Sequence, residues 1–272
     1  MQEKFKEFNT KRVLDEKCKK HDVNLWKIKV FVNGEHKEQV MCYMCSKENI
    51  ANKEKENVNR ILKEHELNTT YRVFDRDSIV PEKLKQATFK NYIAKTKEEK
   101  ELLDFFRGQT KKYITGMTGN TLVTGTTGIG KSHLSYALAK NINETFYQNN
   151  NPKSVLFVTF TDIVSKIQNS WDKKSDNNFT NYEAVELLSK VDYLVLDDLG
   201  AKNSILKPKS DWEQDLLFDI LNKRENTIIN TNLSSEELAM VYNERNYSRI
   251  INGLKGNSFK ADKISDKRFD GV

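Results

Sequence analysis

Short runs of apolar residues, separated by polar segments, divide most of the chain into expected strands and helices. Each run is short, rich in branched or aromatic residues and flanked by polar positions, as in a buried strand. The runs are Asn120–Thr124, Ser154–Phe160, Val191–Asp198 and Thr227–Asn232. After the first run, Leu134, Leu138 and Ile142 recur at helical spacing. This alternation predicts an α/β fold with a parallel sheet and helices on both faces.

The N-terminal region follows a different pattern, because apolar residues occupy every second position rather than continuous runs. Leu25–Val32 carries Trp, Ile, Val and Val at alternate positions, which is the period of a strand. Asn33-Gly34, a strong signal for a tight hairpin turn, follows directly. A returning strand through Gln39–Met41 would complete a β-hairpin.

The open end of this expected hairpin carries all three cysteines of the chain. They form a C-x-x-H pair and a C-x-x-C pair, and such a set suits tetrahedral Zn²⁺. The candidate ligands are Cys18, His21, Cys42 and Cys45. A hairpin with both pairs at its open end predicts a zinc ribbon, with His36 exposed near the turn. The alternative is a redox C-x-x-C pair beside an unrelated cysteine.

A polar segment rich in Lys, Glu and Asn separates this region from the α/β pattern. Val58, Ile61 and Leu62 fall at helical spacing there, which predicts a thin connecting helix from Lys47 to about Leu67. Asn68–Val80 is typical of a linker. We therefore expect a zinc-ribbon domain over residues 1–46, a helical linker over 47–78 and the α/β domain over 79–272.

Composition favours an ordered cytoplasmic protein. The 272 residues are 37% hydrophobic and 10% aromatic, enough to build a core. The longest apolar run, near Tyr193–Leu196, is too short to cross a membrane, and Met1–Phe8 lacks an apolar signal segment. Net charge is +6, with seven basic residues between Arg245 and Arg268; this stretch is either a solvated surface or a phosphate contact.

The first apolar run leads into a sequence of the form G-x-x-x-x-G-K-S. Glycines let such a loop direct backbone N–H groups at phosphates, the lysine reaches the β- and γ-phosphates, and the serine ligates Mg²⁺. Strand and helix flank it as this chemistry requires. The candidate ATP-binding residues are Gly125, Thr126, Thr127, Gly128, Ile129, Gly130, Lys131, Ser132 and His133.

Acidic residues at the end of the run Val191–Asp198 extend the expected site. The position of Asp197 suits the Mg²⁺ shell, and Asp198 is placed to polarise the attacking water. Asn232, at the end of the last run, could orient that water. The alternative for Asn232 is a simple turn residue before Leu233.

Several linked motifs resemble the DnaC/DnaI/IstB group of AAA+ ATPases over about residues 78–260. They are GTTGIGKSH (125–133), LVLDDLG (194–200), WEQDLLFDILNKR (212–224), IINTNLS (228–234) and YSRI (247–250). The resemblance implies an AAA+ ATPase with slow, Mg²⁺-dependent, partner-regulated hydrolysis and self-association through the ATPase domain. With a zinc ribbon in front, it implies a bacterial or phage loader that delivers a hexameric DnaB-type replicative helicase onto single-stranded DNA.

The resemblance also suggests roles for residues near the C-terminus. Arg249 matches the family's arginine finger, which reaches a neighbouring subunit's γ-phosphate; Arg245 is the rival, and both could instead be solvated helix residues. Lys260 stands where a nucleotide-sensing arginine is usual; it keeps the positive charge but lacks the bidentate geometry of arginine.

In the group that the chain resembles, the segment after the second run often faces single-stranded DNA. Its candidate DNA contacts are Phe160, Lys166, Trp171, Lys173 and Lys174. The alternative for Trp171 is a place in the core.

Two other functions remain open from the sequence. One is a transposase-assisting ATPase, which shares the ATPase motifs but not the zinc ribbon. The other is a nucleotide-binding adaptor with negligible turnover. Hydrolysis measured with and without single-stranded DNA separates the adaptor from an active switch.

Overall fold

The computed structural model describes residues 12–32, 34–171, 179–200 and 207–267. The expected DNA contacts Lys173 and Lys174 lie outside these ranges. The chain divides into two compact units, Met1–His65 and Glu66–Val272. The domain boundaries expected from the sequence remain a prediction.

The first unit contains a three-stranded antiparallel sheet in the order β1-β2-β3. Its strands are β1 (Arg12–Lys17), β2 (Asn24–Val32) and β3 (Glu35–Met41). The β2–β3 register runs from Val32 opposite Glu35 to Trp26 opposite Met41, so the predicted hairpin strands are present. β1 was not expected, because its residues are nearly all exposed and show no apolar alternation.

Helix α1 (Tyr43–Thr69) follows β3 directly and has 27 residues, none of them buried. Ile61, one of the apolar residues at helical spacing, is 64% exposed. The helix is longer than the sequence suggested and takes in the second C-x-x-C cysteine, Cys45. Among the described helices of the chain, none combines the length and apolar character needed to cross a bilayer.

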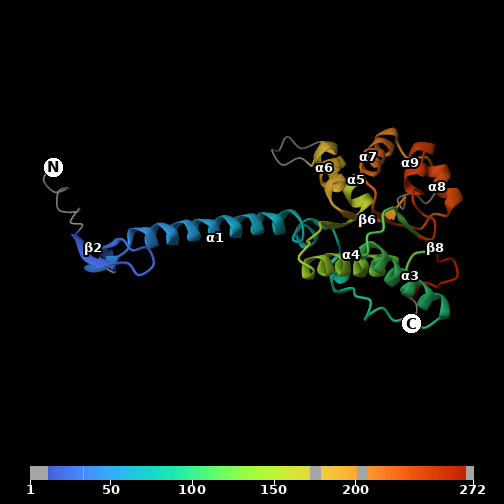
Figure 1. Cartoon of the computed structure of the whole chain (residues 1–272). Coiled ribbons are helices and arrows are strands. Elements are labelled where there is room, and N and C mark those ends of the chain that lie inside the picture. The colour runs from blue at the N-terminus through green and yellow to red at the C-terminus, as the bar shows by residue number, and fades with distance from the viewer. Residues whose placement is uncertain (1–11, 33, 172–178, 201–206, 268–272) are drawn as a thin grey trace. The chain divides into compact units, whose positions relative to one another are not determined.

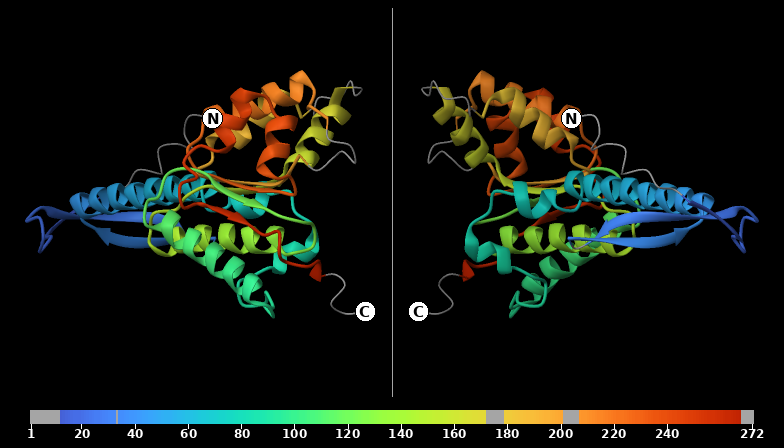
Figure 2. Two further views of the ribbon diagram at one scale, coloured as in Figure 1. Left: turned by 90° about the vertical axis from the view of Figure 1, so that its right-hand side faces the viewer. Right: turned by 90° about the vertical axis from the view of Figure 1, so that its left-hand side faces the viewer.

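The second unit is built on a five-stranded sheet in the order β5-β6-β7-β4-β8, visible edge-on in Figure 2. All its pairings are parallel. The strands are β4 (Thr121–Thr124), β5 (Val155–Thr159), β6 (Tyr193–Leu199), β7 (Thr227–Thr231) and β8 (Ser258–Lys260). The first four correspond to the four apolar runs, so the predicted parallel α/β fold is confirmed.

Helices cover both faces of this sheet, as Figures 1 and 2 show. One face packs against α3 (Lys97–Ile114) and α4 (Lys131–Gln148), with Leu134, Leu138 and Ile142 fully buried. The other face supports the helices that follow β5, joined in a second core cluster. These are α5 (Phe160–Trp171), α6 (Asn181–Lys190), α7 (Asp211–Asn222), α8 (Ser235–Val241) and α9 (Glu244–Ile250).

The segment expected to be a linker contributes to both cores. It contains α2 (Val73–Asp77), whose Val73 and Phe74 are buried in different clusters, and is followed by the 3₁₀ helix η2 (Glu82–Gln86). Two apolar residues in a polar surrounding give no periodic signal. No pattern in the sequence therefore indicates this helix.

Candidate nucleotide site and metal centre

The glycine-rich loop between β4 and α4 requires glycine for backbone reasons. Gly128 and Gly130 have φ angles of +79° and +95°, in the region that L residues with a Cβ rarely adopt. A Cβ on Gly128 would lie 1.8 Å from Oδ1 of Asp266, and one on Gly130 would lie 2.5 Å from the Tyr92 ring. Glycine at these positions lets the loop lead directly into α4, which begins at Lys131, so the N-terminus of this helix borders the site.

A pocket of about 380 Å³ opens beside this loop. Its walls come from the loop and from the carboxyl ends of β5, β6 and β7, where ligands of open parallel sheets usually bind. The lining residues are Thr127, Gly128, Gly130, Lys131, Ser132, Thr159, Asp197, Asp198 and Asn232. The sheet thus brings together the glycine-rich loop, both expected acids and Asn232.

The side chain of Lys131 is held inside the pocket by hydrogen bonds to three oxygen atoms. Its Nζ donates to the carbonyls of Gly125 at 2.7 Å and Thr126 at 2.8 Å, and to Oδ1 of Asn232 at 2.7 Å. Burial lowers the pKa of Lys131 to about 8, although Asp197 and Asp198 act in the opposite direction. An anionic phosphate beside Nζ would raise this pKa again and stabilise the charged form, so the site favours phosphate binding.

A β-bulge explains how two consecutive acids of one strand line the same pocket. Side chains normally alternate between faces, but β6 advances from Leu196 to Leu199 while β7 advances only from Ile229 to Thr231. Asp198 lies within this bulge and has a φ of +57°. The sequence predicted the two acids but not the bulge that makes their joint use possible.

Asp197 lies deep in the pocket and is held by polar neighbours. Nδ2 of Asn230 donates to its Oδ1 at 2.7 Å and to Oγ of Ser135 at 2.7 Å. Burial raises the pKa of Asp197, while hydrogen bonds from Asn230 and Ser132 oppose the rise. A carboxylate beside the Ser132 hydroxyl is the oxygen donor set that Mg²⁺ prefers, so these residues fit the metal.

Asp198 is linked to Lys131 through Asn232. Nδ2 of Asn232 donates to Oδ1 of Asp198 at 2.9 Å, while its own Oδ1 accepts from Lys131. Burial raises the pKa of Asp198, and Lys131 and Asn232 oppose the rise. Asn232 is thus part of a hydrogen-bonded chain, and the arrangement can hold a carboxylate ready to polarise a water molecule near a bound phosphate.

Other expected nucleotide contacts lie around the pocket rather than on its wall. Ile129 is fully buried in the core. His133 turns away, with Nε2 2.9 Å from the Thr88 carbonyl oxygen and its ring beside Tyr92. Gly125 and Thr126 take part through the carbonyls that accept from Lys131.

The two candidate arginines lie on α9 and do not line the pocket of their own chain. The guanidinium of Arg245 is 3.9 Å from the centre of the Phe218 ring, and that of Arg249 is 5.9 Å from it. Lys260, on β8, pairs with Asp262 at 2.8 Å. Of the expected DNA contacts, Phe160 is buried in the core, whereas Trp171 is exposed.

Two residues that the sequence did not single out hold the glycine-rich loop from outside. The Tyr92 hydroxyl donates to the Ile129 carbonyl at 2.9 Å, and the Lys267 backbone N–H donates to the Gly128 carbonyl at 3.2 Å. Lys267 also lies 3.9 Å from the Tyr92 ring and pairs with the buried Glu99 at 3.2 Å. Both are far from the loop in sequence, so no local pattern could have identified them.

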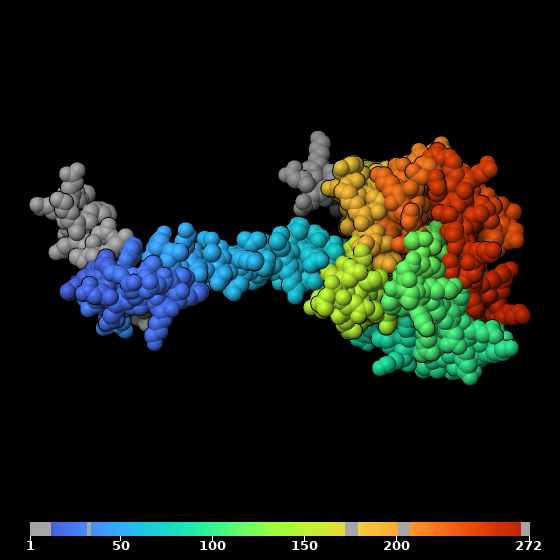
Figure 3. Space-filling model, viewed as in Figure 1, coloured from blue at the N-terminus to red at the C-terminus, as the bar shows by residue number. Residues whose placement is uncertain are grey.

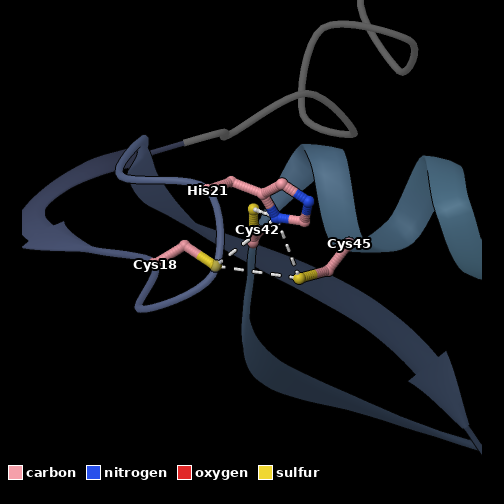
Figure 4. A group of neighbouring side chains, drawn as sticks. All are labelled: Cys18, His21, Cys42 and Cys45. Carbon is pink, nitrogen blue, oxygen red and sulfur yellow. Dashed lines mark hydrogen bonds between the residues drawn. The ribbon is translucent and has the colours of Figure 1, made fainter.

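The cysteine and histidine residues of the first unit form one compact cluster (Figure 4). One ligand atom from each of Cys18, His21, Cys42 and Cys45 lies within 4.8 Å of all the others. Nδ1 of His21 is 3.4 Å from the Cys45 sulfur and 3.7 Å from the other two. A tetrahedron with bonds of about 2.3 Å has edges of about 3.8 Å. The cluster therefore has the size and donor set of a zinc site.

Glu48 supports this cluster from outside. It lies one turn along α1 from Cys45, and its Oε1 is 3.0 Å from Nε2 of His21, the ring nitrogen that faces away from the sulfurs. A carboxylate in this position would fix the ring with Nδ1 directed at the three sulfurs, the orientation that a metal ligand needs. The hydrogen bond with Glu48 is the main reason why the pKa of His21 rises to about 9. The sequence analysis missed Glu48; its position three residues after Cys45 was the available signal.

The sheet order, the glycine-rich loop after β4 and the acidic pair at the end of β6 define a P-loop nucleotide-binding fold of the AAA+ class. Within that class, the chain belongs to the family of IstB-like ATP binding proteins, whose model matches residues 44–251. A comparison with curated proteins finds no match.

Solved structures share this fold. The DnaC helicase loader covers 68% of this chain with all of its own length, at 20% identity and a TM-score of 0.50. The structure of DnaI covers 69% of this chain with 96% of its own, at 23% identity and a TM-score of 0.50. The family and these folds confirm the resemblance to the DnaC/DnaI/IstB group.

Proposed function

We propose that this protein is an ATP-hydrolysing loader that delivers a hexameric DnaB-type replicative helicase onto single-stranded DNA in the cytoplasm. The proposal rests on the nucleotide pocket, on a fold shared with the DnaC loader, and on the zinc-type cluster that precedes the ATPase unit in the sequence. ATP binding would order the assembly, and hydrolysis would release or reset it.

The observation that carries the ATPase part is the hydrogen-bonded chain from Lys131 through Asn232 to Asp198. In this proposal Lys131 leaves Asn232 to contact the β- and γ-phosphates, and Asp198, oriented by Asn232, accepts a proton from the attacking water. Ser132 and Asp197 would hold Mg²⁺, which neutralises phosphate charge when bound.

Arg249 would complete the site of a neighbouring subunit. It does not line the pocket of its own chain and lies on the short helix α9. Its guanidinium is near the Phe218 ring, and among the described residues no carboxylate forms an ion pair with it. An arginine supplied by a neighbour stabilises charge on the transferred phosphoryl group. Hydrolysis would then require self-association through the ATPase units.

The zinc-ribbon unit would bind the helicase. Strands β1 and β3 consist mostly of exposed residues and β2 mostly of half-buried ones, so the sheet alone has little core. The four ligands would supply the missing folding free energy when they hold Zn²⁺. The metal thus has a structural role, and the surface of the unit is left for a partner.

The test combines the purified protein, a hexameric DnaB-type helicase from the host and an oligo(dT) strand. We expect the helicase to co-purify with the protein, and to move onto the oligonucleotide only when ATP is present. ATP turnover should rise when both partners are added. No capture of the helicase would contradict the loader proposal, and ATP binding without turnover under all conditions would indicate an adaptor.

A further inference from the structure

A second hollow, of about 390 Å³, lies between α6 and α7. The two helices pack against each other and adjoin on the surface, coloured yellow and orange in Figure 3. Tyr182, Trp212, Asp215, Asp219 and Lys223 are among its lining residues. It shares no lining residue with the nucleotide pocket, so the function proposed above does not account for it.

Aromatic side chains are unusually exposed at this groove. Tyr182, which lines the groove, is 73% exposed. Trp171, at the end of α5 and outside the lining, is 61% exposed. The Trp171 ring meets Trp212 edge-on, with centroids 5.1 Å apart. Exposed aromatic rings around a hollow are typical of binding surfaces, because they contribute large contact area at low entropic cost.

The charge of the two helices is opposite to that of the whole chain. The chain has a net charge of +6, yet α6 and α7 carry six acids and one lysine, Lys190. The acids are Glu183, Glu186, Asp211, Glu213, Asp215 and Asp219. Lys190 is already paired with Glu186.

Two of these acids face the groove one helical turn apart on α7. Asp215 and Asp219 are exposed, and within the described part of the chain neither has an ion-pair partner. Lys223, at the end of the same row, is the one cation among the lining residues. The groove is therefore both acidic and aromatic.

We propose that this groove binds a lysine- or arginine-bearing segment of a partner protein. A cation is attracted to aromatic faces and forms its strongest hydrogen bonds with carboxylates, and both groups line this hollow. Nucleic acid is the wrong partner, because Asp215 and Asp219 would repel its phosphates. The proposal depends neither on ATP hydrolysis nor on helicase loading.

The experiment uses the full-length protein and a fluorescent twelve-residue peptide of alternating arginine and glycine. Fluorescence anisotropy at low salt should show binding, and a peptide with glutamine in place of arginine should not bind. The double variant Asp215→Asn/Asp219→Asn should weaken binding about tenfold. Tyr182→Ala should weaken it about threefold through loss of the ring.

The matched control is Glu101→Gln/Asp104→Asn, which removes two exposed acids from α3 and changes the net charge equally. It should bind the arginine peptide like the parent protein. Equal weakening in this control, or unchanged binding by the 215/219 variant, would overturn the proposal. Loss of oligo(dT) binding in Tyr182→Ala would assign the face to DNA and overturn it as well. Circular dichroism and unchanged ATP turnover show that each variant is folded.

Discussion

Lys131 and Asp198 stand at the two ends of the hydrogen-bonded chain through Asn232, and their substitution should separate binding from hydrolysis. Lys131→Ala removes the phosphate contact, so we expect ATP binding to fall below detection. Asp198→Asn should retain binding and lower hydrolysis about 10²- to 10⁴-fold, because the amide cannot accept the proton of the water. A fluorescent ATP analogue measures binding, and phosphate release measures turnover.

Asparagine is a suitable replacement at position 198, because it tolerates the φ of +57° found there. The variant therefore changes the chemistry with little change in the backbone. Turnover equal to that of the parent in Asp198→Asn would assign the activation of water to another residue.

At the metal cluster, Glu48 should affect zinc binding without being a ligand. Removing the carboxylate that orients a metal-bound histidine usually weakens binding 10- to 100-fold. We expect an effect of about this size for Glu48→Ala, measured by competition with a chromogenic zinc chelator. Glu54→Ala, an exposed residue of the same helix, is the control. Equal affinities for the two variants would show that Glu48 has no role at the metal.

Residues that belong to a short motif could be predicted from the sequence, whereas residues that act from a distance could not. The spacing of Gly125–Ser132 and of the four metal-ligand candidates is local and chemically restrictive. Asn230, fully buried in β7, holds Asp197 but resembles any polar residue in an apolar run. Tyr92 and Lys267 reach the loop only through the tertiary fold.

At the scale of elements, residues that cap helices should contribute more to the free energy of unfolding than exposed polar residues of loops. Thr96 begins α3 with a reciprocal capping box to Glu99. Thr96→Ala should lower the free energy of unfolding of the second unit by about 1 kcal/mol. Thr118→Ala, on the exposed loop after the helix, should change it by less than about 0.5 kcal/mol. Urea denaturation followed by circular dichroism compares the two, and equal effects would contradict the assignment.

The buried strands were predictable because each is a continuous apolar run, the pattern of a parallel sheet covered on both faces. β1 and α2 were not, for opposite reasons. β1 is held by pairing with β2 and buries almost nothing. α2 buries two adjacent residues within a polar stretch, too few to show a period. The bulge in β6 is equally invisible, since it depends on the register with β7.

At the scale of the whole molecule, the proposed role of Arg249 predicts rescue between subunits. Arg249→Ala should bind ATP normally and hydrolyse it on the order of 10³-fold more slowly in the assembly. Mixed with Lys131→Ala, which keeps its arginine, it should regain part of the activity, because some interfaces then join an intact pocket to an intact arginine. Turnover is measured with oligo(dT) and helicase present.

The mixing ratio provides the control, since activity should pass through a maximum between the two pure variants. If Arg249 acted within its own chain, neither subunit would hold a complete site. The absence of rescue at every ratio, with assembly verified by size, would remove Arg249 from the catalytic residues.

The division into two compact units predicts two separate melting transitions in calorimetry. A zinc chelator should abolish the transition of the first unit and leave the other unchanged, because the ATPase core contains none of the four ligands. A non-hydrolysable ATP analogue at 100 times its Kd should stabilise only the second unit, by about 2.7 kcal/mol. A single transition that responds to both ligands would contradict this independence.

At Asp198, which has a left-handed backbone conformation, the residue that is best for stability differs from the residue that is best for activity. Glycine would adopt a φ of +57° with less strain than any residue with a Cβ, and such strain costs on the order of 1 kcal/mol. The proposed chemistry nevertheless needs a carboxylate there. Selection for thermal stability alone would therefore favour glycine. The result would be a more stable protein that binds ATP but does not hydrolyse it. If Asp198 activates the water as proposed, the acid at this position serves turnover at a cost in stability.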